Sequence, residues 1–214
     1  MSLSTPAAAT EVPAGQRDRA THELRDRLID AALVEFAASG FDGASTRAIA
    51  RRAGAHQPQI NYHFASKEDL WKATVERLLS EFDELIPLLA GAPPRDQFAA
   101  VIRALVEFAA IRPELNRIMI HEATSSSDRL EWLVETHLRW RAGPLLEVWD
   151  EVVAVGGAAP VPRELVYHLL IGASALLNAN APEARMLFGI EPTDACIVAA
   201  HADALVAMFL PTHP

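Results

Sequence analysis

The sequence is poor in cysteine and aromatic residues and has no apolar run long enough for a membrane. One cysteine in 214 residues excludes an internal disulfide framework and is typical of a reducing compartment. Aromatic residues make up 7% of the chain, while Ala, Leu and Val are abundant, a composition that favours helix over sheet. The apolar stretch 169–177 is too short to cross a bilayer, and residues 1–10 lack the features of a signal peptide. We therefore predict an all-α, cytoplasmic protein without a membrane partner, in which Cys196 is a small buried hydrophobe.

Acidic side chains are absent from residues 43–67, although the whole chain carries a formal net charge of -9. Within those 25 residues the basic side chains are Arg47, Arg51, Arg52 and Lys67. The wider segment 17–72 has nine Lys or Arg against eight Asp or Glu, whereas the rest of the chain has ten against twenty. This asymmetry predicts that one surface meets a polyanion while the acidic remainder stays away from it.

Helical periodicity and a glycine turn predict a helix-turn-helix domain at residues 21–66. The first helix should span about 22–39 and the second 46–53, and a third should begin near Gln57. Residues 1–20 show no periodicity and are predicted to be a disordered arm. Helix-turn-helix geometry combined with local positive charge points to double-stranded DNA as the partner.

Residues 67–214 are predicted to form a larger helical domain. Ser66 should open a fourth helix that runs to about Pro87 and belongs to both domains. The sequence shows no strand pattern and no internal repeat beyond it. The further predicted helices are 95–111, 113–124, 128–155 with a bend at Pro144, 162–178 and 193–210.

Three strings in the first third of the chain fix turn, core and cap positions together. They are STRAIA at 45–50, AG at 53–54 and INYHFASKEDL at 60–70. The pattern resembles the TetR family of transcriptional regulators, and the resemblance covers roughly residues 28–70. Residues 71–214 resemble the family only as an all-α remainder of the right length. The resemblance implies a three-helix DNA-binding domain on a larger helical domain that dimerises and usually binds a small effector.

Two positions depart from the family's commonest pattern. His56 stands where a small hydroxylated cap is usual, and Asn61 stands where a phosphate-binding tyrosine is usual. Hydroxyls and free amides at the start of the second helix suit phosphate, and carboxamides on the third suit adenine edges. Alternative roles are helix capping for His56 and packing against the fourth helix for His63. The residues expected to contact DNA are Ser45, Thr46, Arg47, His56, Gln57, Pro58, Gln59, Asn61, Tyr62, His63 and Lys67.

The two last predicted long helices, 162–178 and 193–210, are apolar on two faces. A helix of this kind must be buried on two sides, so we expect each to pair with its symmetry mate in a four-helix bundle. The alternative is that both are core helices of a monomer. A dimer would read two half-sites about 34–36 Å apart, which predicts an imperfectly palindromic operator. The residues expected at the interface are Leu165, Leu169, Gly172, Ala173, Leu176, Ile197, Leu205, Met208 and Phe209.

Polar and aromatic residues in otherwise apolar helices are candidates to line a pocket for a small-molecule effector. Arg141 among them would suit a carboxylate or phosphate, while ordinary packing or surface exposure is the alternative for each. No metal site is expected, since the pair His121-Glu122 is followed by Ser125 where a zinc-binding motif needs histidine. The candidate effector residues are His121, Glu122, Trp132, His137, Trp140, Arg141, Tyr167 and His168.

The function predicted from these features is a DNA-binding regulator, and specifically a repressor released from its operator by an effector. A regulator without an effector and an activator are alternatives that the sequence leaves open. An all-α small-molecule carrier or enzyme without DNA binding is the alternative from another class. We expect no enzyme and no cofactor, because the sequence has no glycine-rich phosphate loop and no nucleophile elbow.

Overall fold

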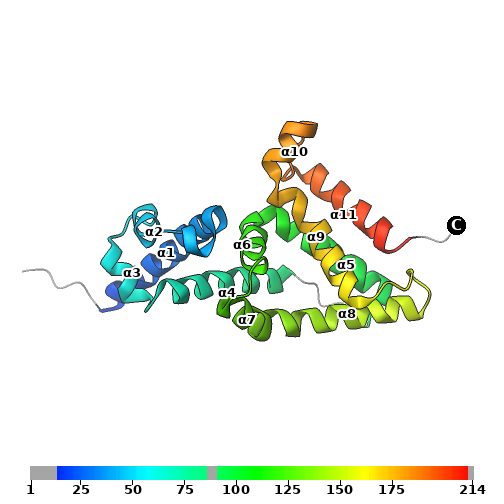
Figure 1. Ribbon diagram of the computed structural model, residues 1–214, viewed down its shortest axis with the longest axis horizontal. Coiled ribbons are helices and arrows are strands. Elements are labelled where there is room, and N and C mark those ends of the chain that lie inside the picture. The colour runs from blue at the N-terminus through cyan, green and yellow to red at the C-terminus, as the bar shows by residue number, and fades with distance from the viewer. Residues whose placement is uncertain (1–13, 86–90, 212–214) are drawn as a thin grey trace, which may run out of the picture.

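The computed structural model describes residues 14–85 and 91–211, and over those residues it is all-α (Figure 1). This confirms the predicted fold class. A π-helical turn, η1, joins α7 to α8 without a break in the helical path. The elements are α1 Ala14–Gly43, α2 Thr46–Arg52, α3 Gln57–His63, α4 Lys67–Leu85, α5 Pro94–Ile111, α6 Pro113–Ala123, α7 Asp128–Leu133, η1 Val134–Leu138, α8 Arg139–Ala154, α9 Arg163–Ala179, α10 Ala181–Phe188 and α11 Ala195–Phe209.

Most helices lie where the sequence predicts them, with three differences. Helix α1 begins at Ala14, inside the segment predicted to be an arm, and residues 1–13 lie outside the described part of the chain. The predicted helix 128–155 is divided into α7, η1 and α8. Helix α10 was not predicted, because its eight residues follow α9 after a single residue, although Pro182 in its first turn and Gly189 at its end are helix start and stop signals. The predicted end of α4 at Pro87 also falls outside the described residues.

The first three helices pack around a core of large aliphatic and aromatic side chains. Leu28 and Phe36 of α1 are fully buried, together with Ile49 of α2 and Ile60 of α3. Gly40 interrupts α1 with a φ of 66°, a left-handed conformation that favours glycine. A β-carbon at Gly40 would lie 3.3 Å from the imidazole ring of His121 in α6, so this position also needs the small residue for close packing.

Helix α4 carries this first core into the rest of the molecule, as Figure 1 shows. Its start is capped by Ser66, whose Oγ accepts from the backbone N–H of Asp69 at 3.0 Å. Leu70 and Trp71 pack with α1, and Leu78 continues the same core towards Ile118 of α6. The first core therefore crosses the domain boundary predicted between residues 66 and 67.

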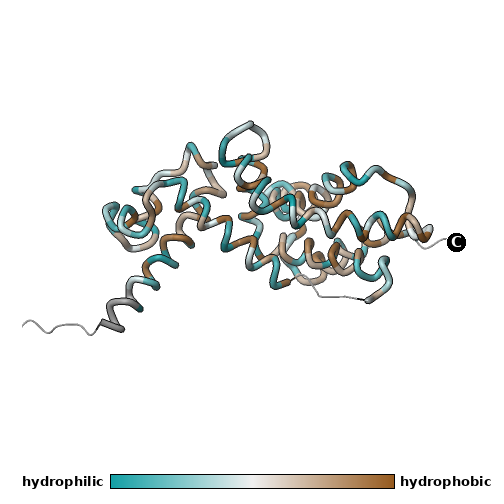
Figure 2. Tube along the Cα trace, turned by 90° about the horizontal axis from the view of Figure 1, so that it is seen from below, coloured by the Kyte–Doolittle hydropathy of each residue, from teal (hydrophilic) through white to brown (hydrophobic). Residues whose placement is uncertain are grey.

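A second core lies between α5, α8, α9 and α11. Phe98, Ile102 and Trp149 are buried in it, and the indole N–H of Trp149 donates to the carbonyl of Val161 at 3.1 Å. We call α1–α4 and α5–α11 the smaller and the larger lobe. In Figure 2 both lobes carry hydrophobic segments along their helices, as two cores require. Cys196 is exposed on α11, contrary to prediction, because the helix buries the neighbouring row that contains Ala202 instead.

No helix within residues 14–85 and 91–211 is long and apolar enough to span a bilayer.

Candidate DNA interface and ligand cavity

Helix α3 presents a polar face to solvent at one end of the molecule. Gln57, Pro58 and Asn61 are exposed, and Tyr62 is 78% exposed. Ile60 fixes the opposite face of the helix in the core at 1% exposure. The four exposed side chains are therefore available to a partner that approaches α3 from outside.

Gln59 has a structural task within α3 itself. Its Oε1 accepts the backbone N–H of His56 at 2.8 Å and so satisfies a donor at the start of the helix. A bidentate contact with adenine needs the amide oxygen to accept and the amide nitrogen to donate at the same time. The bond to His56 holds the amide oxygen of Gln59 towards its own helix start, which disfavours the bidentate contact. The sequence did not predict this division between Gln59 and Gln57.

The start of α2 lies beside the start of α3. Ser45 caps α2 by accepting the backbone N–H of Ala48 at 3.4 Å, and the Thr46 hydroxyl accepts from the amide of Gln57 at 3.4 Å. Arg47 is exposed next to them. Arg52, at the other end of α2, forms an ion pair with Glu35 at 3.1 Å. The structure thus brings Ser45, Thr46 and Arg47 onto one surface with Gln57.

Lys67 is held at the junction between the two lobes instead of projecting freely. Its Nζ lies 4.6 Å from the centre of the Phe41 ring and donates to the carbonyl of Asp42 at 3.4 Å. The guanidinium of Arg129 from α7 stacks over Phe41 at 3.8 Å. Burial lowers the pKa of Lys67 from its usual range. These contacts give Lys67 a packing role that the sequence did not predict.

His63 is half-buried at the end of α3. Its ring contacts that of Tyr62 edge to face, with 5.1 Å between centres, and lies 6.4 Å from that of Phe64. Burial lowers the pKa of His63, and the charges of Arg25 and His22 lower it further. The ring is therefore biased towards its neutral form.

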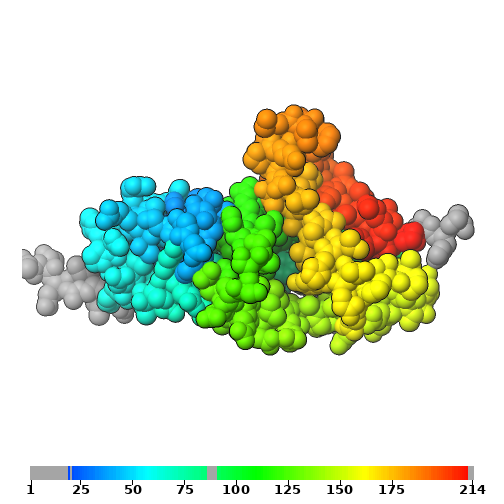
Figure 3. Space-filling model, viewed as in Figure 1, coloured from blue at the N-terminus to red at the C-terminus, as the bar shows by residue number. Residues whose placement is uncertain are grey.

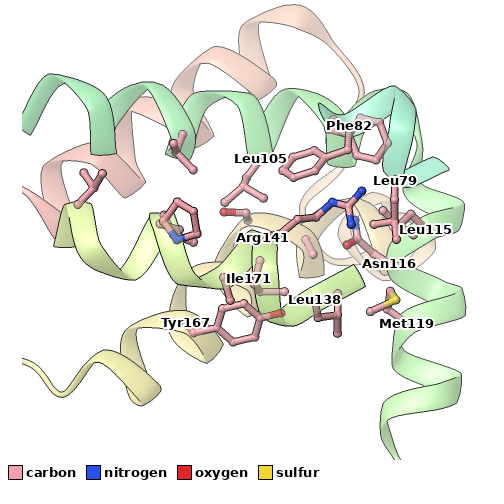
Figure 4. Close-up of a pocket in the computed structure, with 18 of the residues that line it drawn as sticks. Leu79, Phe82, Leu105, Leu115, Asn116, Met119, Leu138, Arg141, Tyr167 and Ile171 are labelled. Atoms are coloured by element: carbon pink, nitrogen blue, oxygen red, sulfur yellow. The ribbon is translucent and has the colours of Figure 1, made fainter. Parts of the chain in front are cut away.

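A cavity of about 300 Å³ lies in the larger lobe and is lined mainly by apolar side chains (Figure 4). The helices that build it are α4, α5, α6, α8 and α9 together with η1. Its size falls at the lower end of the range for small-molecule sites. The space-filling view in Figure 3 shows a hollow between α6 and α9 and shows α10 projecting from the body. The lining residues are Leu79, Phe82, Gln97, Val101, Leu105, Phe108, Leu115, Asn116, Met119, Leu138, Arg141, Ala142, Pro144, Leu145, Val148, Tyr167, Ile171, Ser174 and Ala175.

Five polar residues line this cavity, and they come from α5, α6, α8 and α9. Figure 4 places Arg141 near Asn116 and Leu115, with Tyr167 on another side. Arg141 binds Asp83 of α4 through two bonds, Nε to Oδ1 at 2.9 Å and Nη2 to Oδ2 at 2.6 Å. Burial raises the pKa of Tyr167, so its phenol stays neutral and able to donate. The hydroxyl of Ser174 is buried without a hydrogen-bond partner in the described part of the chain.

Of the eight candidate effector residues, Arg141 and Tyr167 line the cavity. Asn116, Gln97 and Ser174 also line it but were not singled out from the sequence. Each is a neutral polar residue within an apolar helical pattern, which is the signal that could have identified it.

The other six candidates lie elsewhere, and packing explains where. His121 faces Gly40 of α1, and Glu122 is 5% exposed in an ion pair with Arg129 at 3.1 Å. Trp132 packs edge to face on Trp71, with ring centres 5.9 Å apart. His137 lies beside the carboxylate of Glu76. The indole N–H of Trp140 donates to the carbonyl of Thr136, and the ring of His168 contacts the carbonyl of Glu164.

An uncovered apolar face runs along α9. Leu165, Leu169 and Leu176 are exposed on it together with Gly172, and Met208 of α11 is exposed as well. Ala173 and Ile197 are half-buried. Two residues predicted for the interface belong to the second core instead: Leu205 is 5% exposed, and the ring of Phe209 lies 6.2 Å from that of Phe98.

Within the described ranges, no group of three or more His, Cys, Asp or Glu side chains is placed to hold a metal ion.

Comparisons with known proteins identify the family. The model of the bacterial regulatory proteins of the tetR family matches residues 28–74. The HTH-type transcriptional regulator RutR of Escherichia coli (strain K12) is 33% identical over 187 residues, which cover 82% of this chain and 83% of RutR. The chain belongs to the TetR family. It is therefore a DNA-binding transcriptional regulator, as the sequence predicts.

Two further similarities extend over both lobes. The class D tetracycline repressor protein of Escherichia coli is 25% identical over 192 residues, which cover 78% of this chain and 85% of the repressor. Among solved structures, AibR in complex with isovaleryl coenzyme A and operator DNA has a TM-score of 0.73 at 17% identity, covering 89% of this chain and 100% of AibR. The likeness to AibR shows that the two chains share a fold.

Proposed function

We propose that the chain is a dimeric repressor that holds a palindromic operator and releases it when a small molecule enters the cavity. The course of α4 carries this proposal. Its early turns pack in the first core through Leu70 and Trp71, and its later turns contribute Leu79 and Phe82 to the cavity. A ligand that alters the cavity acts directly on a helix that packs against α1, against which α2 also packs, and that follows α3 in the chain. Effector and operator should then weaken each other's binding by the same factor.

The names of similar proteins support this proposal. One is a tetracycline repressor, and the structure of AibR contains both an acyl coenzyme A and operator DNA. Neither comparison identifies the effector of this chain.

The DNA contacts that we propose follow the exposed surface of α2 and α3. Gln57, Asn61 and the ring of Pro58 would contact base edges in the major groove. Tyr62, with Ser45, Thr46 and Arg47, would bind the phosphates on either side. His56 and Gln59 position α3, and Lys67 supports the junction behind it.

We assign the apolar face of α9 to the dimer. Leu165, Leu169 and Leu176 are 54–56% exposed, so burying the rest of each against a second copy would contribute about half of the roughly 1.5–3 kcal/mol of a full burial. The substitution Leu169→Glu should convert the dimer to a monomer in sedimentation velocity. Val155→Glu, at an exposed apolar residue beyond the end of α8, is the control. A native protein that sediments as a monomer at micromolar concentration would contradict the assignment.

The test of the whole proposal is a binding titration with DNA from upstream of the chain's own gene. Binding is monitored by fluorescence anisotropy at two salt concentrations. A regulator loses affinity steeply as salt rises, because each neutralised phosphate releases counterions. A carrier would show no salt-dependent binding to any DNA. A regulator without an effector would bind the DNA but respond to no compound that enters the cavity.

A further inference from the structure

The charge that faces the cavity points to the chemical class of its ligand. Among the lining residues in the described part of the chain, Arg141 is the single charged side chain, and no carboxylate lines the wall. A cationic ligand would meet the guanidinium of Arg141 and no carboxylate on the cavity wall, because Asp83, which neutralises Arg141, does not line it. The surrounding wall is aliphatic and aromatic, so most of the ligand must be apolar.

Arg141 is already paired, and the two partners of that pair have unequal access to water. The Arg141 side chain is 13% exposed, whereas Asp83 is 35% exposed on the last turn of α4. If the pair separates, the carboxylate can be solvated where it stands. The guanidinium cannot lose its proton and needs another acceptor in its buried position. The exchange with the smallest cost in free energy is therefore one in which Arg141 keeps its buried position and Asp83 is released to solvent.

The guanidinium can also meet an incoming acceptor before Asp83 departs. Asp83 uses two of its five N–H groups, and Nη1 donates to the carbonyl of His137 and also lies 3.4 Å from the Nδ1 of that residue. One N–H on Nη2 remains, and Asn116 lies beside the guanidinium in Figure 4. A carboxylate that binds these groups competes for the charge that Asp83 now neutralises.

We propose that the effector is a mainly apolar molecule with a carboxylate that takes Arg141 from Asp83. This inference rests on the proposed function, since it names the ligand class and the regulation of the same cavity. The ion pair between Asp83 and Arg141 links the end of α4 to α8. Its loss removes that link to α8, while Glu81 stays paired with Arg112 at 2.6 Å, Phe82 stays packed on Phe108, and Lys72 over Trp132 still holds the first turns to α7. A neutral ligand leaves the bond in place and has no such effect on α4.

The test compares three probes of one chain length, octanoate, 1-octanol and octylamine, by isothermal titration of the full chain. Octanoate should bind roughly tenfold or more tightly than 1-octanol, because only its carboxylate forms charged hydrogen bonds with the guanidinium of Arg141. Octylamine should bind most weakly of the three. Arg141→Met should lower octanoate affinity by a similar factor and leave 1-octanol unchanged. The melting temperature of each variant shows whether it is folded.

Asp83→Asn separates this proposal from simple charge attraction. Removing the competing carboxylate should tighten octanoate binding severalfold, and octanoate should then change operator affinity less than in the native protein. Asp150→Asn is the matched control, since Asp150 is also paired with an arginine, Arg163 at 2.9 Å, but Arg163, unlike Arg141, does not line the cavity.

Several outcomes would overturn the proposal. These are equal affinity for octanoate and 1-octanol, no effect of Asp83→Asn, and no binding of hexanoate, octanoate or decanoate at millimolar concentration. If a neutral or cationic compound fills the cavity and releases DNA, the ligand class is wrong while the repressor proposal stands. If octanoate binds through Arg141 but operator affinity never changes, the effector mechanism of the proposed function fails instead.

Discussion

The DNA interface and the cavity are assembled in opposite ways. The exposed polar face of α2 and α3 comes from residues 45–62, and short-range bonds such as that between His56 and Gln59 hold it in shape. The cavity takes its lining from residues 79–175, on helices that meet only in the folded chain. A local motif can therefore be recognised in a sequence while a cavity of the same protein cannot, because its neighbours are chosen by tertiary packing.

The two cores allow the strongest test of how separate these regions are. Phe36 of the first core and Phe98 of the second are both fully buried. Replacing either with Ala should lower the free energy of unfolding by about 3–5 kcal/mol through lost burial and the cavity left behind. Because α4 carries the first core into the larger lobe, calorimetry should show one transition that shifts in both variants.

Val155→Ala, at an exposed site, is the control for these core substitutions and should be close to neutral. Two resolved transitions, with only one shifted in each variant, would contradict the continuous core. The boundary between residues 66 and 67 would then separate two independently stable units.

The junction between the regions can be weakened at Glu122. Its carboxylate is 5% exposed, accepts from Arg129 at 3.1 Å and also bonds the hydroxyl of Ser127. Glu122→Ala should cost roughly 1.5–3 kcal/mol of stability in chemical denaturation, because charged donors lose their acceptor. Glu131→Ala on the exposed side of α7 is the control. A loss no larger than that of the control would show that the buried pair adds nothing to the junction.

Within the DNA interface, Gln57 and Gln59 should behave differently although they are identical side chains two residues apart. Gln57→Ala should cost about 1–3 kcal/mol of operator affinity and relax preference at one base pair. Gln59→Ala should cost roughly 1 kcal/mol on every sequence alike, since it removes a cap bond at the start of α3. Anisotropy with the operator and with single-base variants measures both effects. A change of base preference in Gln59→Ala would contradict its assignment to capping.

The sequence predicts the fold class and the starts of α2 to α4 from spacing, because caps, turns and buried rows lie within a few residues of each other, and it indicates the family through a resemblance over residues 28–70. It finds Arg141 and Tyr167 because a charge or a phenol in an apolar helix is conspicuous. It misses Ser174 and Asn116, which are small or neutral, and it misplaces Glu122 and Trp132. For those two the deciding partners, Arg129 and Trp71, are on other helices, and no periodicity reveals such pairs.

The smallest expected effect concerns His63, which lies between packing and DNA contact. Its pKa in the folded protein is lowered by burial and by Arg25 and His22, so the unfolded chain binds the proton more tightly. This contribution to stability is retained above the ordinary pKa of about 6.5 and is lost as pH falls below it towards the folded value. His63→Gln should reduce that loss in denaturation curves. If the ring also contacts a phosphate, DNA raises its pKa, and operator affinity at constant ionic strength should increase from pH 8 to pH 6 in the native protein but not in the variant. Equal pH profiles for the two proteins would assign His63 to packing against Tyr62 and Phe64 alone.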